Sequence, residues 1–286
     1  MLRPLTIVAG KGGVGRSTTT AALALNAAAI GKRVLAVDVT NDGGLRAALS
    51  TVPPAERVGI EILELTTEES LDEYIKVYLK IPIPPSRLGP IARIFDFVAT
   101  AAPGVREILT IGKIAFEVRE GVWDAVIVDA PATGHVIELL AAPDTLREVV
   151  SVGPLAGQTQ WIADLLRDPS ITGVITVTTS ETLPVTESLE LLERLVETTE
   201  IDPIGFVVNR LPDLLDESGY EEAGRLLDEL PSRDPLARAV AIVANRSAAA
   251  VEELDRLASL DLGLTWVPES ADPVAAVRAA LDEVGA

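Results

Sequence analysis

The chain has 286 residues, 48% of them hydrophobic, which is enough for one large α/β domain or two small ones. Its net charge of −19 argues against nucleic acid and against an anionic membrane surface, because binding to either depends on lysine and arginine. The absence of cysteine excludes disulfides, thiolate zinc sites and iron–sulfur clusters. No apolar run approaches the roughly 20 residues of a membrane span, and no signal-peptide pattern is present. We therefore expect a soluble cytoplasmic protein without stable membrane insertion.

The first predicted strand, residues 5–9, leads into a glycine-rich turn and then into a helical run, residues 18–30. The turn reads Gly-Lys-Gly-Gly-Val-Gly-Arg-Ser-Thr, a phosphate-loop pattern with Arg16 in the place of the usual lysine. Glycines let backbone N–H groups point inward, and the helix N-terminus adds partial positive charge. A turn that binds nothing is the alternative, but the strand–helix context argues against it. The predicted phosphate-binding residues are Gly10, Gly12, Gly13, Val14, Gly15, Arg16, Ser17 and Thr18.

The sequence of this turn resembles the deviant Walker A motif of the signal-recognition, MinD-like and BioD-like class of nucleotide-binding proteins. In the dimeric members of that class, a lysine early in the loop reaches the partner's nucleotide across the interface. Lys11 stands at that position here. The resemblance therefore implies a dimer whose two active sites face each other.

Predicted strands and helices alternate along the rest of the chain. Further strands are predicted at residues 33–37, 59–65, 125–128, 172–177, 206–208 and 264–267. Further helices are predicted at residues 45–49, 70–80, 182–198, 221–230 and 236–258 and from 273. Such alternation is typical of a parallel sheet covered on both faces. We predict an α/β P-loop NTPase fold with about 7–8 mostly parallel strands, in a single domain over residues 1–286.

An apolar helical segment, residues 70–120, is predicted as an insertion within this domain. It contains two unusually apolar runs, residues 88–99 and 104–118, separated by Ala-Ala-Pro. We expect these runs to be core helices that pack on the sheet. A docking surface for an apolar client or a partner protein is the alternative.

Two aspartates, Asp38 and Asp129, end predicted buried strands. Parallel α/β sheets place ligand-binding groups at the carboxyl ends of their strands. Asp129 fits the Walker B role of holding the water shell of Mg²⁺, whereas for Asp38 a turn cap is the alternative reading. The loop after Asp129 has the backbone freedom to sense a γ-phosphate. His135, the only histidine, is interpreted as structural.

The segment Asp-Ala-Pro-Ala-Thr-Gly-His, residues 129–135, closely resembles switch II of the arsenical-pump ATPase family. Leu139, Leu140 and Pro143 continue the likeness. That family also includes the guided-entry factors that deliver tail-anchored membrane proteins. With the phosphate loop, Asp38 and Asn209, the resemblance covers four places over most of the chain. The middle region looks most like small, single-domain actinobacterial members.

This resemblance implies an ATP-binding, Mg²⁺-dependent ATPase. Its catalytic residues would be Lys11, Asp38 and Arg16, with Asp38 in switch I orienting the attacking water. The magnesium site would comprise Ser17, Asp38 and Asp129. Asn209 would read the adenine, with Arg210 and Pro268 also at the nucleotide. ATP is favoured over GTP because no Asn-Lys-x-Asp guanine motif is present.

Three departures from the family pattern matter. Arg16 keeps the positive charge of the usual lysine but replaces a compact ammonium by a planar guanidinium, and the two are not interchangeable at a phosphate. Switch I reads Asp-Val-Thr-Asn-Asp from Asp38, where the targeting factors have Asp-Pro-Ala-His-Asn. Without cysteine, neither thiolate ligation of arsenite nor a bridging zinc site is available.

Two classes of function follow from these observations. The first is a nucleotide-switched ATPase, a homodimer or a heterodimer with a related ATPase, that couples hydrolysis to a partner or an apolar protein client. The second, suggested by Arg16, is a catalytically weak, nucleotide-binding regulatory subunit paired with a paralogue. A MinD- or ParA-like positioning ATPase is a weaker third option, because the chain is acidic.

Overall fold

The computed structural model describes residues 2–65, 105–149 and 154–283. Within these residues, seven parallel strands form one sheet in the order β3-β2-β4-β1-β5-β6-β7. The strands are β1 (Leu5–Gly10), β2 (Val34–Asp38), β3 (Ile60–Glu64), β4 (Ala125–Asp129), β5 (Thr172–Thr179), β6 (Pro203–Leu211) and β7 (Leu264–Pro268). The predicted parallel α/β architecture is confirmed.

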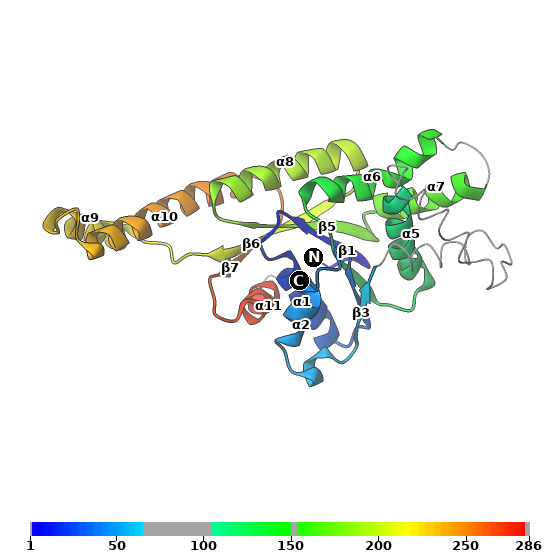
Figure 1. The fold of residues 1–286 in the computed structure, drawn as a ribbon, viewed down its shortest axis with the longest axis horizontal. Helices are drawn as coiled ribbons and strands as arrows, with labels where there is room; N and C mark the ends of the chain where they lie inside the picture. Colours follow the sequence, from blue (N-terminus) through cyan, green and yellow to red (C-terminus); the bar gives the residue numbers. More distant parts are fainter. Residues whose placement is uncertain (1, 66–104, 150–153, 284–286) are drawn as a thin grey trace.

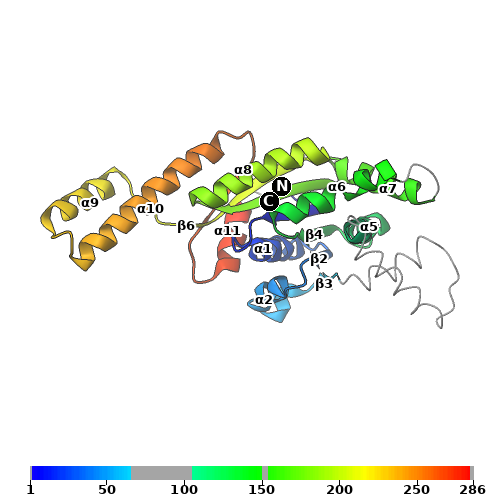
Figure 2. The ribbon, with the colours of Figure 1, turned by 45° about the horizontal axis from the view of Figure 1, so that its top comes forward.

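Helices cover both faces of the sheet (Figure 2). One face carries α1 (Arg16–Ala29), α2 (Gly44–Ser50) and α11 (Pro273–Glu283), and the other carries α5 (Val105–Glu120), α6 (Thr133–Val149), α7 (Pro154–Arg167) and α8 (Thr182–Thr199). Side chains alternate between these layers, so Ile7 packs toward α5 and α6 while its neighbour Val8 packs toward α1. Both core layers are apolar, which is why the strands read as continuous hydrophobic runs.

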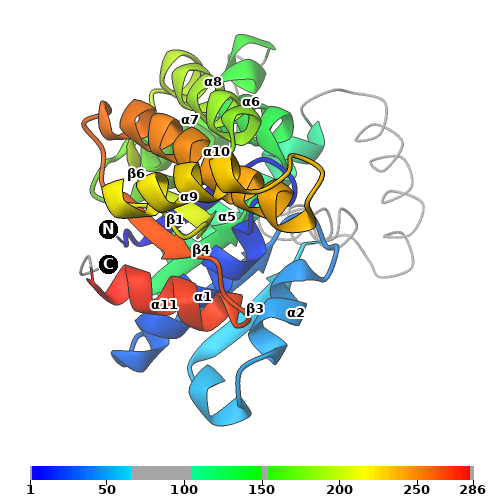
Figure 3. The ribbon, with the colours of Figure 1, turned by 90° about the vertical axis from the view of Figure 1, so that its left-hand side faces the viewer.

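A helical hairpin extends beyond the β7 edge of the sheet (Figures 1 and 3). It consists of α9 (Glu217–Glu229) and α10 (Pro235–Ala258), and each helix begins at an aspartate, Asp216 or Asp234, whose side chain caps the first turn. The base of α10 is anchored on the sheet because Leu257 packs with Phe206 of β6. No helix in the described part of the chain is both long and apolar enough to cross a bilayer.

Among the described residues, the helices that the sequence did not predict are α6, α7 and the short 3₁₀ turn η1 (Pro54–Arg57). Helix α6 begins inside the segment read as a switch loop and continues through Pro143, a residue that normally argues against a helix interior. Helix α5 matches the predicted run 104–118, and its apolar face, including Ile111 and Ile114, is buried against the sheet. That run is therefore core. The predicted helices at 70–80 and 88–99 lie outside the described residues.

Candidate nucleotide site

The glycine-rich turn follows β1 and passes directly into α1. Gly10 and Gly15 have φ angles of 153° and 103°, which side chains rarely adopt. A Cβ on Gly10 would collide with the carbonyl oxygen of Val177, and one on Gly15 would collide with the amide of Asn209. The loop is thus held between β5 and β6. No side chain in the described part of the chain caps the N-terminus of α1, so its backbone N–H groups are available to an anion.

Asn209, at the end of β6, fixes the phosphate loop from one side. Its Nδ2 donates a hydrogen bond to the carbonyl oxygen of Val14 at 2.9 Å, and its Oδ1 accepts one from the backbone N–H of Arg210 at 2.9 Å. Asn209 is buried, whereas Arg210 is exposed and has a left-handed φ of 55°. Pro268 ends the neighbouring strand, β7. All three predicted base-binding residues therefore lie at one corner of the sheet.

Arg16 occupies the first position of α1, where the usual lysine would contact phosphate. Its guanidinium donates a hydrogen bond to the carbonyl oxygen of Ala130, the residue after Asp129. The backbone N–H of Ala130 in turn donates to the carbonyl oxygen of Val8 at 3.1 Å. Arg16 therefore links the phosphate loop to the loop after β4. Because a guanidinium has five N–H donors, this bond leaves donors available for a phosphate.

Asp38 and Asp129 are register partners on the adjacent strands β2 and β4, and both are buried. Asp38 Oδ1 accepts hydrogen bonds from the Thr40 hydroxyl at 2.9 Å and the Asn41 N–H at 2.8 Å. Asp38 Oδ2 and Asp129 Oδ1 are buried with no hydrogen-bond partner in the described part of the chain. Two unsatisfied carboxylate oxygens at one sheet edge are an unfavourable arrangement unless a cation or its waters complete it.

The pKa of Asp129 is raised to about 6, and burial is the main cause. The nearby carboxylates of Asp38 and Asp42 also act to raise this pKa, while a hydrogen bond from Ser17 and the charge of Arg16 act to lower it. Carboxylate and hydroxyl oxygens are the ligands that Mg²⁺ prefers, and Mg²⁺ usually keeps several waters. The donor set of Ser17, Asp38 and Asp129 therefore fits Mg²⁺, held through one or two carboxylates rather than a complete protein cage.

The loop after β2 closes over the phosphate loop near Ser17. A Cβ on Gly44 would lie 2.9 Å from Ser17 Oγ and 3.0 Å from Asp42 Oδ1. Asp42 Oδ1 also accepts a hydrogen bond from the Gly44 N–H at 2.9 Å. Asp42 is thus a third carboxylate beside the predicted magnesium site. The sequence showed it only as part of a turn-rich loop.

Lys11 points to α8 within its own chain. Its Nζ lies 2.8 Å from Glu187 Oε1, and about a third of each side chain is exposed. Such a solvent-accessible pair contributes only about 0–1 kcal/mol. Replacement of Glu187 by another anion at Lys11 therefore costs little free energy. Glu187 was not singled out from the sequence, because nothing in a helical glutamate marks it as a partner of a residue 176 positions away.

The structure thus gathers the predicted site residues at the carboxyl end of the central strands. The phosphate loop, Asp38 and Asp129 surround the N-terminus of α1, and Asn209 contacts the loop directly. The residues that sequence reasoning missed are the partners Ala130, Glu187 and Asp42.

Comparisons with known proteins place this arrangement in a family. The family model for anion-transporting ATPases matches residues 4–156, more than half of the chain. The chain belongs to this anion-transporting ATPase family. The predicted P-loop fold class and the predicted family resemblance are both confirmed.

Named members of the family support the assignment. ATPase BagA of Mycobacterium tuberculosis is 36% identical over 221 residues, which cover 71% of this chain and 64% of BagA. ATPase get3 of Schizosaccharomyces japonicus is 25% identical over 244 residues, 71% of this chain and 73% of the relative. The arsenical pump-driving ATPase of Escherichia coli is 29% identical over 247 residues, 82% of this chain and 39% of the relative. The chain thus matches just under two thirds of the mycobacterial relative's length.

Proposed function

We propose that this chain is a Mg²⁺-dependent ATPase that works as a nucleotide-switched dimer and couples hydrolysis to a partner or an apolar client. The pairing of Asp38 with Asp129, each with a buried unsatisfied oxygen next to the phosphate loop, carries the proposal. Without a cation, these carboxylates would repel the phosphates of a nucleotide. With Mg²⁺ bound, the same charges hold the nucleotide in place.

In this proposal the backbone of residues 12–18 holds the phosphates. Ser17 and Asp129 hold Mg²⁺ or its waters, and the metal supplies charge neutralisation at the phosphate oxygens. Asp38 orients the attacking water through its free Oδ2, while its bonds to Thr40 and Asn41 fix the carboxylate in place. Positioning of this kind is most of what phosphoryl transfer requires from a protein.

Adenine is the base that the corner at Asn209 suits best. The Nδ2 group carries two hydrogens, and the bond to Val14 uses only one of them. The second hydrogen remains for an adenine ring nitrogen, with Arg210 and Pro268 beside it. The residues that follow Asn209 are Arg-Leu-Pro, which lack the aspartate of a guanine-binding motif.

The dimer places Lys11 at the nucleotide of the partner subunit. For that, Lys11 must leave Glu187, an exchange that the modest strength of an accessible ion pair allows. A phosphate carries more negative charge than one carboxylate, so nucleotide favours the exchange. The partner is a second copy of this chain or a related ATPase.

A regulatory subunit with weak catalysis is a second candidate, favoured by the hydrogen bond between Arg16 and Ala130. This bond fixes the guanidinium on the protein backbone, so Arg16 can approach a γ-phosphate only with its remaining N–H groups and without the reach of a lysine. In this case the chain binds nucleotide and an active paralogue supplies turnover.

Steady-state hydrolysis of Mg-ATP by the purified full chain tests the proposal. We expect turnover that requires Mg²⁺, and we expect Lys11→Ala and Asp38→Asn each to reduce it by about 100-fold or more, because each removes a group at the reacting phosphate. Tight ATP binding without turnover would support the regulatory subunit instead. Absence of both binding and turnover in a folded, pure protein would refute both candidates.

A further inference from the structure

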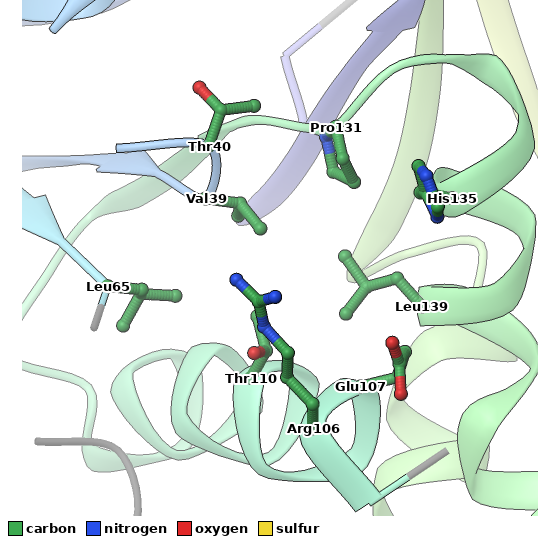
Figure 4. Close-up of a pocket in the computed structure, with 9 residues that line it drawn as sticks. All are labelled: Val39, Thr40, Leu65, Arg106, Glu107, Thr110, Pro131, His135 and Leu139. Carbon is green, nitrogen blue, oxygen red and sulfur yellow. The ribbon is translucent and has the colours of Figure 1, made fainter. Parts of the chain in front are cut away.

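A cavity with a volume of about 190 Å³ lies beside the candidate nucleotide site (Figure 4). It opens between the loop after β2, the loop after β4 and the first turns of α5. None of the phosphate-loop residues lines it. The proposed ATPase chemistry therefore leaves this cavity unexplained.

One part of the cavity wall is apolar, whereas the rest, which includes Thr40 and Thr110, is polar. Val39, Leu65, Pro131 and Leu139 come from four different segments of the chain and converge on the same space (Figure 4). Apolar walls of this kind hold aliphatic groups, and they disfavour small, strongly hydrated ions such as inorganic phosphate, which would lose their water without replacement.

A cationic side chain of α5 points into the cavity. The Arg106 guanidinium extends from α5 toward Val39 and Leu65 (Figure 4). In the described part of the chain, Arg106 makes no hydrogen bond or ion pair. Among the described residues, two other titratable groups line the cavity: the Glu107 carboxylate, which lies near Leu139 on the other side, and His135, whose Nδ1 lies 3.1 Å from Glu138. The charge is thus positive at one end and negative at the other.

We propose that this cavity binds a small aliphatic carboxylate, with the carboxylate on Arg106 and the hydrocarbon against Val39, Leu65 and Leu139. A planar guanidinium matches a carboxylate through two parallel hydrogen bonds. The cavity volume of about 190 Å³ is more than about tenfold what one water needs, so a short branched acid fits with room for water beside it. Such an acid has the same division into a charged and an apolar end.

The position of the cavity gives the ligand an effector role. Val39 directly follows Asp38, and Pro131 lies two residues after Asp129, so an occupant touches both loops that carry the magnesium-site carboxylates. The effector role rests on the proposed ATPase function, whereas the binding itself does not.

Binding of 3-methylbutanoate to the nucleotide-free full chain, followed by ligand-observed NMR, tests the site. We expect the acid to bind about tenfold more tightly than the neutral isostere 3-methylbutanamide. Arg106→Gln should remove this preference, and Arg106→Lys should retain part of it. Glu107→Gln should strengthen binding of the acid by about two- to threefold, because it removes a like charge. Arg238→Gln, on the exposed side of α10, is the matched control and should change nothing.

Equal binding of acid and amide, no binding of the acid, or binding that Arg106→Gln leaves intact would each overturn the site. The effector role is tested separately, by ATP turnover at saturating 3-methylbutanoate. A change of twofold or more that Arg106→Gln abolishes supports it. An unchanged rate overturns the effector role, while the binding data still decide the site. Failure of the ATPase itself would appear as absent turnover with and without the acid.

Discussion

At Gly15, the backbone conformation and the nearby amide of Asn209 together leave no room for a side chain. Gly15→Ala should therefore lower the free energy of unfolding by about 1–3 kcal/mol and weaken nucleotide binding, because the strained loop must shift away from Asn209. Gly12→Ala is the matched control, since nothing lies within 4 Å of a Cβ there, and it should change stability by less than about 0.5 kcal/mol. Chemical denaturation measures both. Equal losses in the two variants would contradict the geometry of the loop.

In the absence of nucleotide and metal, Asp129 should make the stability of the protein depend on pH. Its pKa of about 6 in the folded protein lies above the ordinary value of 3.8, so the folded state binds more protons between these pH values. Stability should therefore fall as pH rises from about 4 to about 6. With the charge removed, Asp129→Asn should be more stable than the parent at pH 7.5, by on the order of 2–3 kcal/mol in EDTA.

The pH profile of Asp129→Asn should also be flatter between pH 4 and 6. Asp228→Asn, an exposed position on α9, is the control and should follow the parent profile. A parent-like profile for Asp129→Asn would rule out the raised pKa. Stability against urea at a series of pH values provides the data.

At the residue scale, the sequence predicted those site residues whose type and spacing form a recognisable local motif. The phosphate loop and the strand-ending Asp38 and Asp129 could be predicted because a strand, a turn and a carboxylate each leave a local pattern. The contacts of Arg16 with Ala130 and of Lys11 with Glu187 could not, because they join segments more than 100 residues apart.

Among the elements, α11 is held to α1 by a buried polar contact rather than by apolar packing alone. Asn26 Nδ2 donates to Asp282 Oδ1 at 2.8 Å and to the Arg278 carbonyl oxygen at 3.1 Å, while Asn26 Oδ1 accepts from Arg278 Nε at 3.1 Å. Asn26→Ala should reduce stability by about 1–2 kcal/mol, because it leaves these partners unsatisfied.

Hydrogen exchange locates the effect of Asn26→Ala. Amides of α11 should lose protection in the variant, while those of β1 and β4 should follow the global stability. Ser50→Ala, at the exposed end of α2, is the control. Unchanged exchange in α11 would show that apolar contacts alone hold the helix.

The strands were predictable for a physical reason. Strands buried on both faces are continuous apolar runs, and β1, β2, β4 and β5 are buried along their whole length. Helix α6 was missed because it contains Pro143 and has apolar residues on several sides, so no helical periodicity marks it in the sequence. Tertiary packing against the sheet overrides these local signals.

For the molecule as a whole, the proposed dimer builds each active site from two subunits. The Asp38 and Asp129 pair, the phosphate loop and Asn209 come from one chain, while the proposed position of Lys11 is at the nucleotide of the other. In the structure, Lys11 forms an ion pair with Glu187 of its own chain. Two individually inactive variants should therefore restore activity when they share a dimer.

The most direct test mixes Lys11→Ala with Asp38→Asn, after unfolding and refolding together, and measures Mg-ATP turnover. In a mixed dimer, the Asp38→Asn subunit supplies Lys11 to the intact Asp38 site of the other subunit. Because half of the dimers are mixed and each has one complete site of two, we expect about one quarter of the parent rate. If the mixture is as inactive as each variant alone while the parent hydrolyses ATP, Lys11 acts within its own chain and the two-subunit site is wrong.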